Sequence, residues 1–196
     1  LARAARYLGR YLEFQRDDLD ERERLARIVA DPTLATTPQR RARARFVIEQ
    51  VLAKDPQRHA VRERLCEILI AGRHLEAARE HLTYLEKNRP DDAQTAFLLG
   101  TWHEAQGEAT RARDAYRLSL QRDPAKVDAY VRLARSLKQA DFGQAPAHAE
   151  EIERLILAAL EKAPTDPGVI SLAAQHAQEQ GDTRIALKYL EDGLKH

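Results

Sequence analysis

The side chains that could perform catalysis or bind a metal have spacings that match no catalytic or metal-binding pattern. His103 and Glu104 begin the run His-Glu-Ala-Gln-Gly, but a zinc-binding helix of this type needs a second histidine one turn later, where Gly107 stands. Cys66 is the single cysteine, and its place after a leucine favours a small buried side chain over an exposed, base-activated nucleophile. Both phosphate-binding glycine-loop patterns are absent from the sequence. We therefore predict no catalytic residue, no metal site, no cofactor and no enzymatic activity.

Paired carboxylates occur at positions 17–18, 91–92 and 150–151, where helices are expected to begin. Negative charge at a helix N-terminus complements the helix dipole. The pairs are therefore interpreted as helix-start residues rather than as general acid and base pairs.

A run of arginines is the sharpest charge feature: Arg40, Arg41, Arg43 and Arg45 lie within six residues. On a helix they spread over more than half of the circumference. Nucleic-acid binding patches usually add stacking aromatic side chains, and the one neighbour here, Phe46, is expected to point inward. The run favours a solvated outer helix face, with an acidic partner as the alternative, and no nucleic-acid partner is expected.

The composition describes a chain able to form one large domain or one repeat array. Of its 196 residues, 43% are hydrophobic, and 32 basic and 31 acidic side chains leave a net charge of +1. This near balance argues against bulk attraction to nucleic acid or to anionic lipid. No apolar run approaches the roughly 18–20 residues that span a bilayer, so no membrane contact is expected. The chain begins at Leu1 and contains no methionine, which suggests a fragment of a longer protein, and its compartment is not indicated.

The sequence repeats with a period of 34 residues. Pro56, Pro90 and Pro124 are spaced by 34 residues, and Pro164 follows after 40. The clearest unit, 93–126, carries small and apolar residues at fixed offsets, namely Leu99, Gly100, Gly107, Ala112, Tyr116, Leu120 and Pro124. This pattern resembles the tetratricopeptide repeat, W-x2-L-G-x2-Y followed by A-x3-F and P, with Ala96 and His103 in its two aromatic places.

The units 19–58, 59–92, 127–166 and 167–196 align with that repeat, and residues 1–18 resemble the second helix of a truncated one. The resemblance implies an all-α fold: a right-handed α-solenoid of about five antiparallel helix hairpins preceded by one N-terminal helix. Small residues recur after a leucine where two helices must approach closely, and Gly72, Gly107 and Gly181 stand where a left-handed helix cap is expected. Residues 31–38 and 139–147 contain proline and lack helical periodicity, so both are expected to be enlarged loops.

The resemblance also implies a function, because the first helices of tetratricopeptide hairpins line a concave surface that binds proteins. We expect a non-catalytic scaffold that holds a peptide or protein surface of mixed charge in this groove, with Phe97 as an apolar anchor. The alternative is an architectural or regulatory arm of a larger enzyme, membrane assembly or secretion system. Exposed apolar residues at both ends allow end-to-end self-association. The expected groove residues are Arg27, Glu63, Glu67, Phe97, Thr101, Glu104, Val131, Arg135, Lys138 and Gln175.

Overall fold

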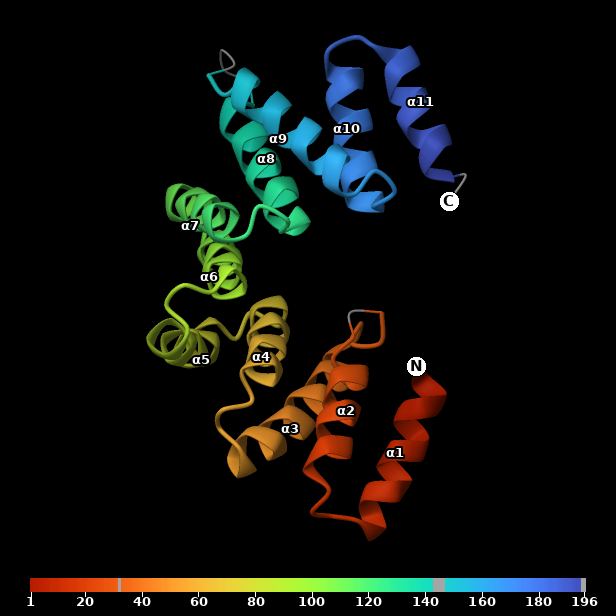
Figure 1. Ribbon diagram of the computed structural model, residues 1–196, viewed down its shortest axis with the longest axis vertical. Coiled ribbons are helices and arrows are strands. Elements are labelled where there is room, and N and C mark those ends of the chain that lie inside the picture. Colours follow the sequence, from red (N-terminus) through yellow and green to blue (C-terminus); the bar gives the residue numbers. More distant parts are fainter. Residues whose placement is uncertain (32, 143–146, 195–196) are drawn as a thin grey trace. The chain divides into compact units, whose positions relative to one another are not determined.

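The described residues of the computed structural model, 1–31, 33–142 and 147–194, form eleven α-helices and no β-strand (Figure 1). The all-α prediction is therefore confirmed, and the helices alternate as the repeat predicts. Their bounds are α1 Ala2–Phe14, α2 Leu19–Val29, α3 Pro38–Lys54, α4 His59–Ala71, α5 Leu75–Asn88, α6 Ala93–Gln106, α7 Ala109–Arg122, α8 Val127–Asp141, α9 Ala149–Lys162, α10 Pro167–Glu179 and α11 Thr183–Leu194.

Short polar side chains fix where several helices begin. The Asp18 carboxylate accepts a hydrogen bond from the Glu21 N–H at 3.1 Å, and the Thr37 hydroxyl accepts one from Arg40 N–H at 3.3 Å. Asp166 caps α10 in the same way, accepting from the N–H groups of Gly168 and Val169 at 2.8 and 3.0 Å. These bonds satisfy N–H groups that have no partner within their own helix.

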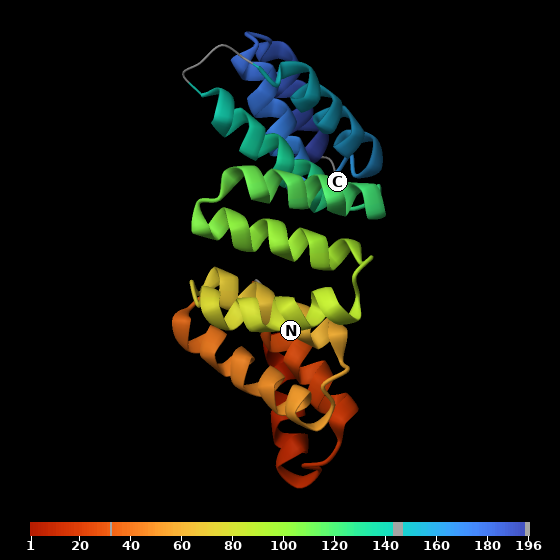
Figure 2. The ribbon, with the colours of Figure 1, turned by 90° about the vertical axis from the view of Figure 1, so that its left-hand side faces the viewer.

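The chain divides into two compact units, and α6 contributes to both. Unit 1 comprises Leu1–Pro90 and Thr101–Gly107, and unit 2 comprises Asp91–Gly100 and Glu108–His196. In unit 1 each helix from α1 to α5 packs on the next, and the first helices α2 and α4 also touch. In unit 2 the same holds from α7 to α11, and the first helices α8 and α10 touch (Figures 1 and 2).

The core of unit 1 is built around the predicted small residues. Ala26 and Cys66 of the first helices and Ala44 and Ala78 of the second helices are at most 1% exposed. Trp102 of α6 packs against this core, and its indole N–H donates to the Leu75 carbonyl at 2.9 Å. The hairpins thus close at small side chains and share one apolar core.

The core of unit 2 contains a close helix contact at Gly100. A Cβ atom on Gly100 would lie 2.5 Å from the ring of Tyr116, which is fully buried on α7. The Ser119 hydroxyl of α7 donates to the Ala93 carbonyl of α6 at 2.8 Å. Glycine is therefore needed here because the tyrosine ring occupies the volume of a side chain.

Left-handed residues end three of the first helices. Gly107 and Gly181 have φ of 81° and 86°, as predicted. The prediction for Gly72 is wrong, because its φ is −84° and Arg73 adopts the left-handed conformation at φ 61°. Arg73 stands five residues before Ala78, the same offset that separates Gly107 from Ala112, so the arginine occupies the glycine position of the repeat.

Candidate binding surfaces

One repeat position supplies half of the predicted groove residues. The residue that directly follows the small residue of each first helix is polar in all five hairpins: Arg27, Glu67, Thr101, Arg135 and Gln175. Arg27, Arg135 and Gln175 are exposed, and Glu67 and Thr101 are half-buried. This position lies one residue beyond the hairpin contact, so each first helix carries a polar side chain on the same side of that contact.

In unit 1 two acidic members of the predicted groove, Glu63 and Glu67, are held by arginines. Glu63 of α4 is ion-paired with Arg89, which follows α5, and the Glu63 side chain is only 14% exposed. Glu67 accepts a hydrogen bond from Arg64 at 2.6 Å. Glu104 is exposed on α6. Glu63 therefore positions the chain after α5, whereas Glu67 and Glu104 lie nearer to solvent.

In unit 2 the predicted groove residues converge on Glu179 of α10. The Lys138 ammonium of α8 lies 2.8 Å from the Glu179 carboxylate, and the Lys138 side chain is 14% exposed. Gln175 Nε2 donates to the same carboxylate at 3.2 Å. Lys138 thus links α8 to α10, while the neighbouring Arg135 stands exposed on α8.

Two apolar members of the predicted groove are not on a free surface. Val131 is 8% exposed and belongs to the core of unit 2, so its expected exposure is wrong. Phe97 is half-buried. The centroid of its ring lies 5.7 Å from the ring centroid of Tyr116 and 5.1 Å from the Lys126 ammonium. Val131 and Phe97 occupy the same repeat position, which in α4 holds Glu63. This position borders the core. A glutamate there stays partly solvated, whereas an apolar side chain turns inward.

The two side chains considered for catalysis or metal binding, Cys66 and His103, are packed against other side chains. Cys66 is fully buried, and burial raises the pKa of its thiol to about 12, so the thiolate needed for nucleophilic attack does not form at neutral pH. His103 is half-buried with its ring edge against Trp102, at a centroid separation of 5.0 Å. Within the described ranges no group of three or more His, Cys, Asp or Glu side chains could hold a metal ion. None of the helices described is long and apolar enough to cross a membrane.

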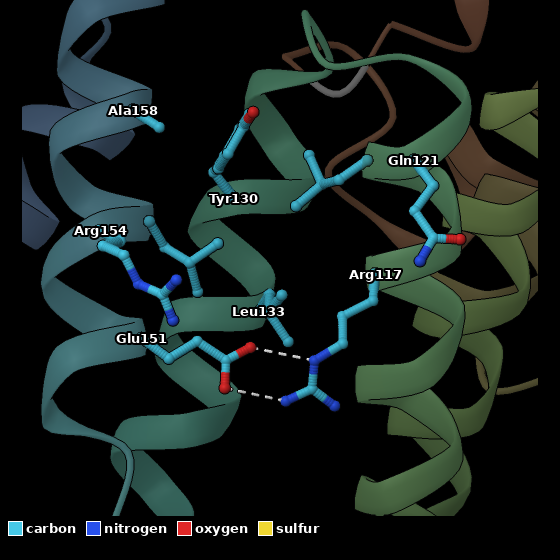
Figure 3. A pocket seen from close by; sticks show the side chains of 9 residues that line it. Arg117, Gln121, Tyr130, Leu133, Glu151, Arg154 and Ala158 are labelled. Carbon is cyan, nitrogen blue, oxygen red and sulfur yellow. Dashed lines mark hydrogen bonds and ion pairs between the residues drawn. The ribbon is translucent and has the colours of Figure 1, made fainter.

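The sequence did not predict a pocket of 420 Å³ on unit 2, which lies between α7, α8 and α9 (Figure 3). Leu120, Leu133 and Leu155 supply apolar lining, and the Tyr130 hydroxyl donates to the Pro124 carbonyl at 3.1 Å. Across the pocket the Arg117 guanidinium donates two hydrogen bonds, each of 3.0 Å, to the Glu151 carboxylate (Figure 3). The sequence feature that could have indicated this contact is the spacing of 34 residues, one repeat length, between Arg117 and Glu151.

The charged residues that line this pocket leave a net positive charge. The hydrogen bonds from Arg117 hold the pKa of Glu151 below its ordinary value, and Arg154 acts on it in the same direction. Arg154 also lines the pocket, so two guanidinium groups face one carboxylate. The pocket suits an apolar side chain that is accompanied by an acidic group.

Residues 38–99, which span α3 to most of α6, match the sequence model of a family described as the tetratricopeptide repeat. This match covers about one third of the chain. A comparison with curated proteins found no matching sequence.

Solved structures share the tetratricopeptide fold over most of the chain. MamA from Desulfovibrio magneticus RS-1 is 16% identical with a TM-score of 0.59, covering 83% of this chain and 85% of its own. TTC0263, a tetratricopeptide protein of Thermus thermophilus, is 16% identical with a TM-score of 0.66, and the match covers 80% of this chain and 83% of TTC0263. A monomeric mutant of IFIT1 with m7Gppp-AAAA is 16% identical with a TM-score of 0.76, covering 98% of this chain and 46% of its own. At these identities the similarity establishes the fold.

Within the tetratricopeptide segment, the arginine run of α3 separates into different roles. Arg40 and Arg41 donate to carbonyl groups of the preceding loop, Leu34 at 3.5 Å and Thr36 at 3.2 Å, and Arg45 pairs with Glu49 at 2.7 Å. The expectation that Phe46 points inward is wrong, because its side chain is 60% exposed. The second helix of this hairpin therefore offers an aromatic ring to solvent, which the sequence pattern had assigned to the core.

Proposed function

We propose that this chain is a non-catalytic scaffold that binds a peptide segment or a protein surface along the exposed faces of its first helices. Tetratricopeptide repeats form interaction scaffolds, and stacked helical repeats present extended binding surfaces. The observation that carries the proposal is the single repeat position at which Arg27, Glu67, Thr101, Arg135 and Gln175 recur. Within each unit, polar side chains at this register position would contact a partner from successive first helices.

Unit 2 offers the best-defined part of this surface. There α8 and α10 are in contact, and the Lys138–Glu179 ion pair fixes one helix against the other. Arg135 is exposed on α8 and Gln175 on α10. A guanidinium group and a carboxamide on two fixed helices suit a partner peptide that supplies a carboxylate to Arg135 and a backbone amide or carbonyl to Gln175.

The proposal is tested by photo-crosslinking from the surface itself. A photo-reactive phenylalanine analogue in place of Gln175 should capture a partner protein from extract, and Arg135→Glu should abolish that capture. The matched control places the same analogue at Leu157, an exposed residue of α9, where we expect no such product. Capture that is equal from both positions, or that persists in the Arg135→Glu variant, would remove the binding site from the first helices.

A further inference from the structure

The outer face of α1 combines arginines with aromatic rings. Arg3, Arg6 and Arg10 are exposed beside Tyr7, which is 56% exposed, and Phe14, which is 85% exposed. These five residues lie within less than one third of the helix circumference at 100° per residue. The opposite face, with Ala5 and Leu12 buried and Leu8 packed on them, belongs to the core of unit 1.

The second helix of the next hairpin extends this face. Arg43 of α3 approaches α1, since a Cβ atom on Gly9 would lie 3.9 Å from its Nη2 atom. Phe46, one turn further along α3, is 60% exposed. We call Arg3, Arg6, Tyr7, Arg10, Arg43 and Phe46 the outer basic face. In the part of the chain that the structure describes, no carboxylate pairs with any of its four arginines.

The two rings, Tyr7 and Phe46, stand at different repeat positions. Ala4 of α1 and Ala44 of α3 each stand 15 residues before the next helix begins, so they share a repeat position. Tyr7 therefore corresponds to Val47, which is 8% exposed, and Arg6 corresponds to Phe46. The first helix of the α3 hairpin, α2, is in place and packed against it, yet Phe46 remains exposed. The repeat position of Phe46 therefore faces outward with its own first helix in place, and α1 carries the exposed Arg6 there.

We propose that the outer basic face binds single-stranded nucleic acid. Unpaired guanidinium groups neutralise phosphates, and exposed rings stack on bases without needing a particular sequence. Arg3 already lies over the ring of Tyr7, with its Cζ atom 5.8 Å from the centroid, so charge and stacking surface are adjacent. The near-zero net charge and the expected burial of Phe46 argued against such a partner. The structure removes the second argument and concentrates the positive charge locally.

The same residues fit a membrane surface less well. An interfacial helix inserts a continuous apolar face among the lipid chains. The apolar face of α1 is buried in the core of unit 1, and the exposed rings come from two helices and alternate with arginines. The proposal goes beyond the peptide surface proposed above, which lies on the first helices.

The test is fluorescence anisotropy with a labelled 12-nucleotide oligouridylate and the full chain. Four phosphate contacts predict a salt slope of about −2.8, and hence about 50-fold weaker binding at 200 mM than at 50 mM salt. Inorganic polyphosphate, which carries the charge without bases, should compete poorly at equal phosphate concentration.

Paired variants separate stacking from charge. Tyr7→Ala with Phe46→Ala should weaken binding at least about tenfold and leave the salt slope unchanged. Arg6→Gln with Arg10→Gln should reduce the slope by about 1.4. The matched control, Arg111→Gln with Leu118→Ala on α7, removes an exposed arginine and an exposed apolar side chain and should bind normally. All of these side chains are exposed, and a thermal melt followed by circular dichroism verifies that each variant is folded.

Several results would overturn the proposal. These are equal displacement by polyphosphate, unchanged binding after loss of both rings, or stronger binding to phosphatidylglycerol vesicles or to an acidic peptide than to the oligouridylate. Arg135→Glu should leave oligouridylate binding intact, so that failure of the peptide surface and failure of the outer basic face are distinguished.

Discussion

At the residue scale, the small residue of each first helix is matched by a residue of the second helix. Hairpin α6–α7 pairs Gly100 with Tyr116, whereas the others combine alanine or cysteine with Ile48, Leu82, Ile156 or Leu190 at the tyrosine position. The combined volume at this contact is therefore held nearly constant. The close packing at glycine was predictable from the repeat, but the matching of the two positions needed the 2.5 Å approach seen in the structure.

This matching predicts a non-additive double variant. Gly100→Ala places a methyl group against the Tyr116 ring and should destabilise the fold by about 1–3 kcal/mol. Tyr116→Leu should also destabilise it, because it leaves a cavity. The double variant recreates the pairing of the other hairpins. Its loss of stability should therefore be smaller, by about 1 kcal/mol, than the sum of the losses of the two single variants. Urea unfolding of the four proteins measures this coupling, and strictly additive costs would mean that the two positions are independent.

Arg73 carries backbone strain that a single substitution can remove. A non-glycine residue in the left-handed region costs about 1 kcal/mol because its Cβ atom crowds the following carbonyl oxygen. Arg73→Gly and Arg73→Ala both remove the hydrogen bond from its guanidinium to the Ala105 carbonyl, but only glycine removes the Cβ atom. We expect the glycine variant to be more stable than the alanine variant by about 1 kcal/mol. Thermal denaturation compares them, and an equal or higher melting temperature for alanine would contradict the strain.

At the scale of elements, the helices were largely predictable because prolines, glycines and capping residues mark their ends. The expected loop 139–147 is shorter than predicted, since α8 continues to Asp141. Gln139, Ala140 and Asp141 contain no helix breaker, and residues 143–146 lie outside the described ranges. Asp141 then accepts hydrogen bonds from the backbone N–H and the ring Nδ1 of His148 at 2.9 and 2.6 Å, a link between α8 and α9 that no local pattern indicates.

The candidate surfaces were predictable only where they follow the repeat. The polar position next to each small residue was found because it recurs in all five hairpins. The outward ring of Phe46 was missed because an aromatic side chain was assigned to the core by its type. The pocket beside Arg117 was missed because it depends on how second helices of successive hairpins approach each other. Such contacts join residues one repeat apart, and helical periodicity within a single element does not report them.

The packing of α4 on α5 depends on an uncharged histidine. Arg62 is 7% exposed, and its guanidinium lies 3.8 Å from the Tyr84 ring centroid and donates to the Pro56 carbonyl at 2.8 Å. Its Nη1 lies 2.9 Å from His81 Nδ1, which must accept the hydrogen bond because arginine has no acceptor atom. Burial, followed by the charge of Arg62, lowers the pKa of His81 below its ordinary value of 6.5.

This histidine predicts a loss of stability in acid. Above pH 6.5 His81 is neutral in both the folded and the unfolded chain and adds no pH dependence. As the pH falls below 6.5, the unfolded chain binds a proton that the folded chain refuses, so the free energy of unfolding decreases until the lowered folded pKa is reached. The loss from His81 is at most about 1.4 kcal/mol at about pH 5.5.

Replacing His81 isolates this contribution. His81→Asn keeps an acceptor near Nδ1 and removes the titration, so its urea midpoint should fall less between about pH 7.5 and about pH 5.5 than that of the original chain. His176, whose pKa is also lowered by burial, remains in both proteins and cancels in the comparison. An identical pH dependence of the two proteins would show that His81 is not held neutral.

At the scale of the whole molecule, the last hairpin leaves apolar side chains exposed. Ile185, Leu187 and Leu190 of α11 are 45%, 54% and 46% exposed. Leu190 occupies the repeat position of Leu82 and Tyr116, which are completely buried. An apolar position that is buried in other hairpins and open in this one is a surface on which another helical face can pack.

We therefore predict that the isolated chain self-associates through α11. Light scattering after size exclusion should give a mass that rises with protein concentration. Leu187→Glu with Leu190→Glu should hold the chain as a monomer with little change in melting temperature, because these side chains are already about half exposed. Leu82→Glu, by contrast, should unfold the chain, because it places an unpaired charge in the core. The control pair Leu118→Glu with Leu157→Glu changes exposed leucines of α7 and α9 and should leave association unchanged. A chain that stays monomeric at high concentration, or an association that Leu118→Glu with Leu157→Glu abolishes equally, would show that α11 is not the contact surface.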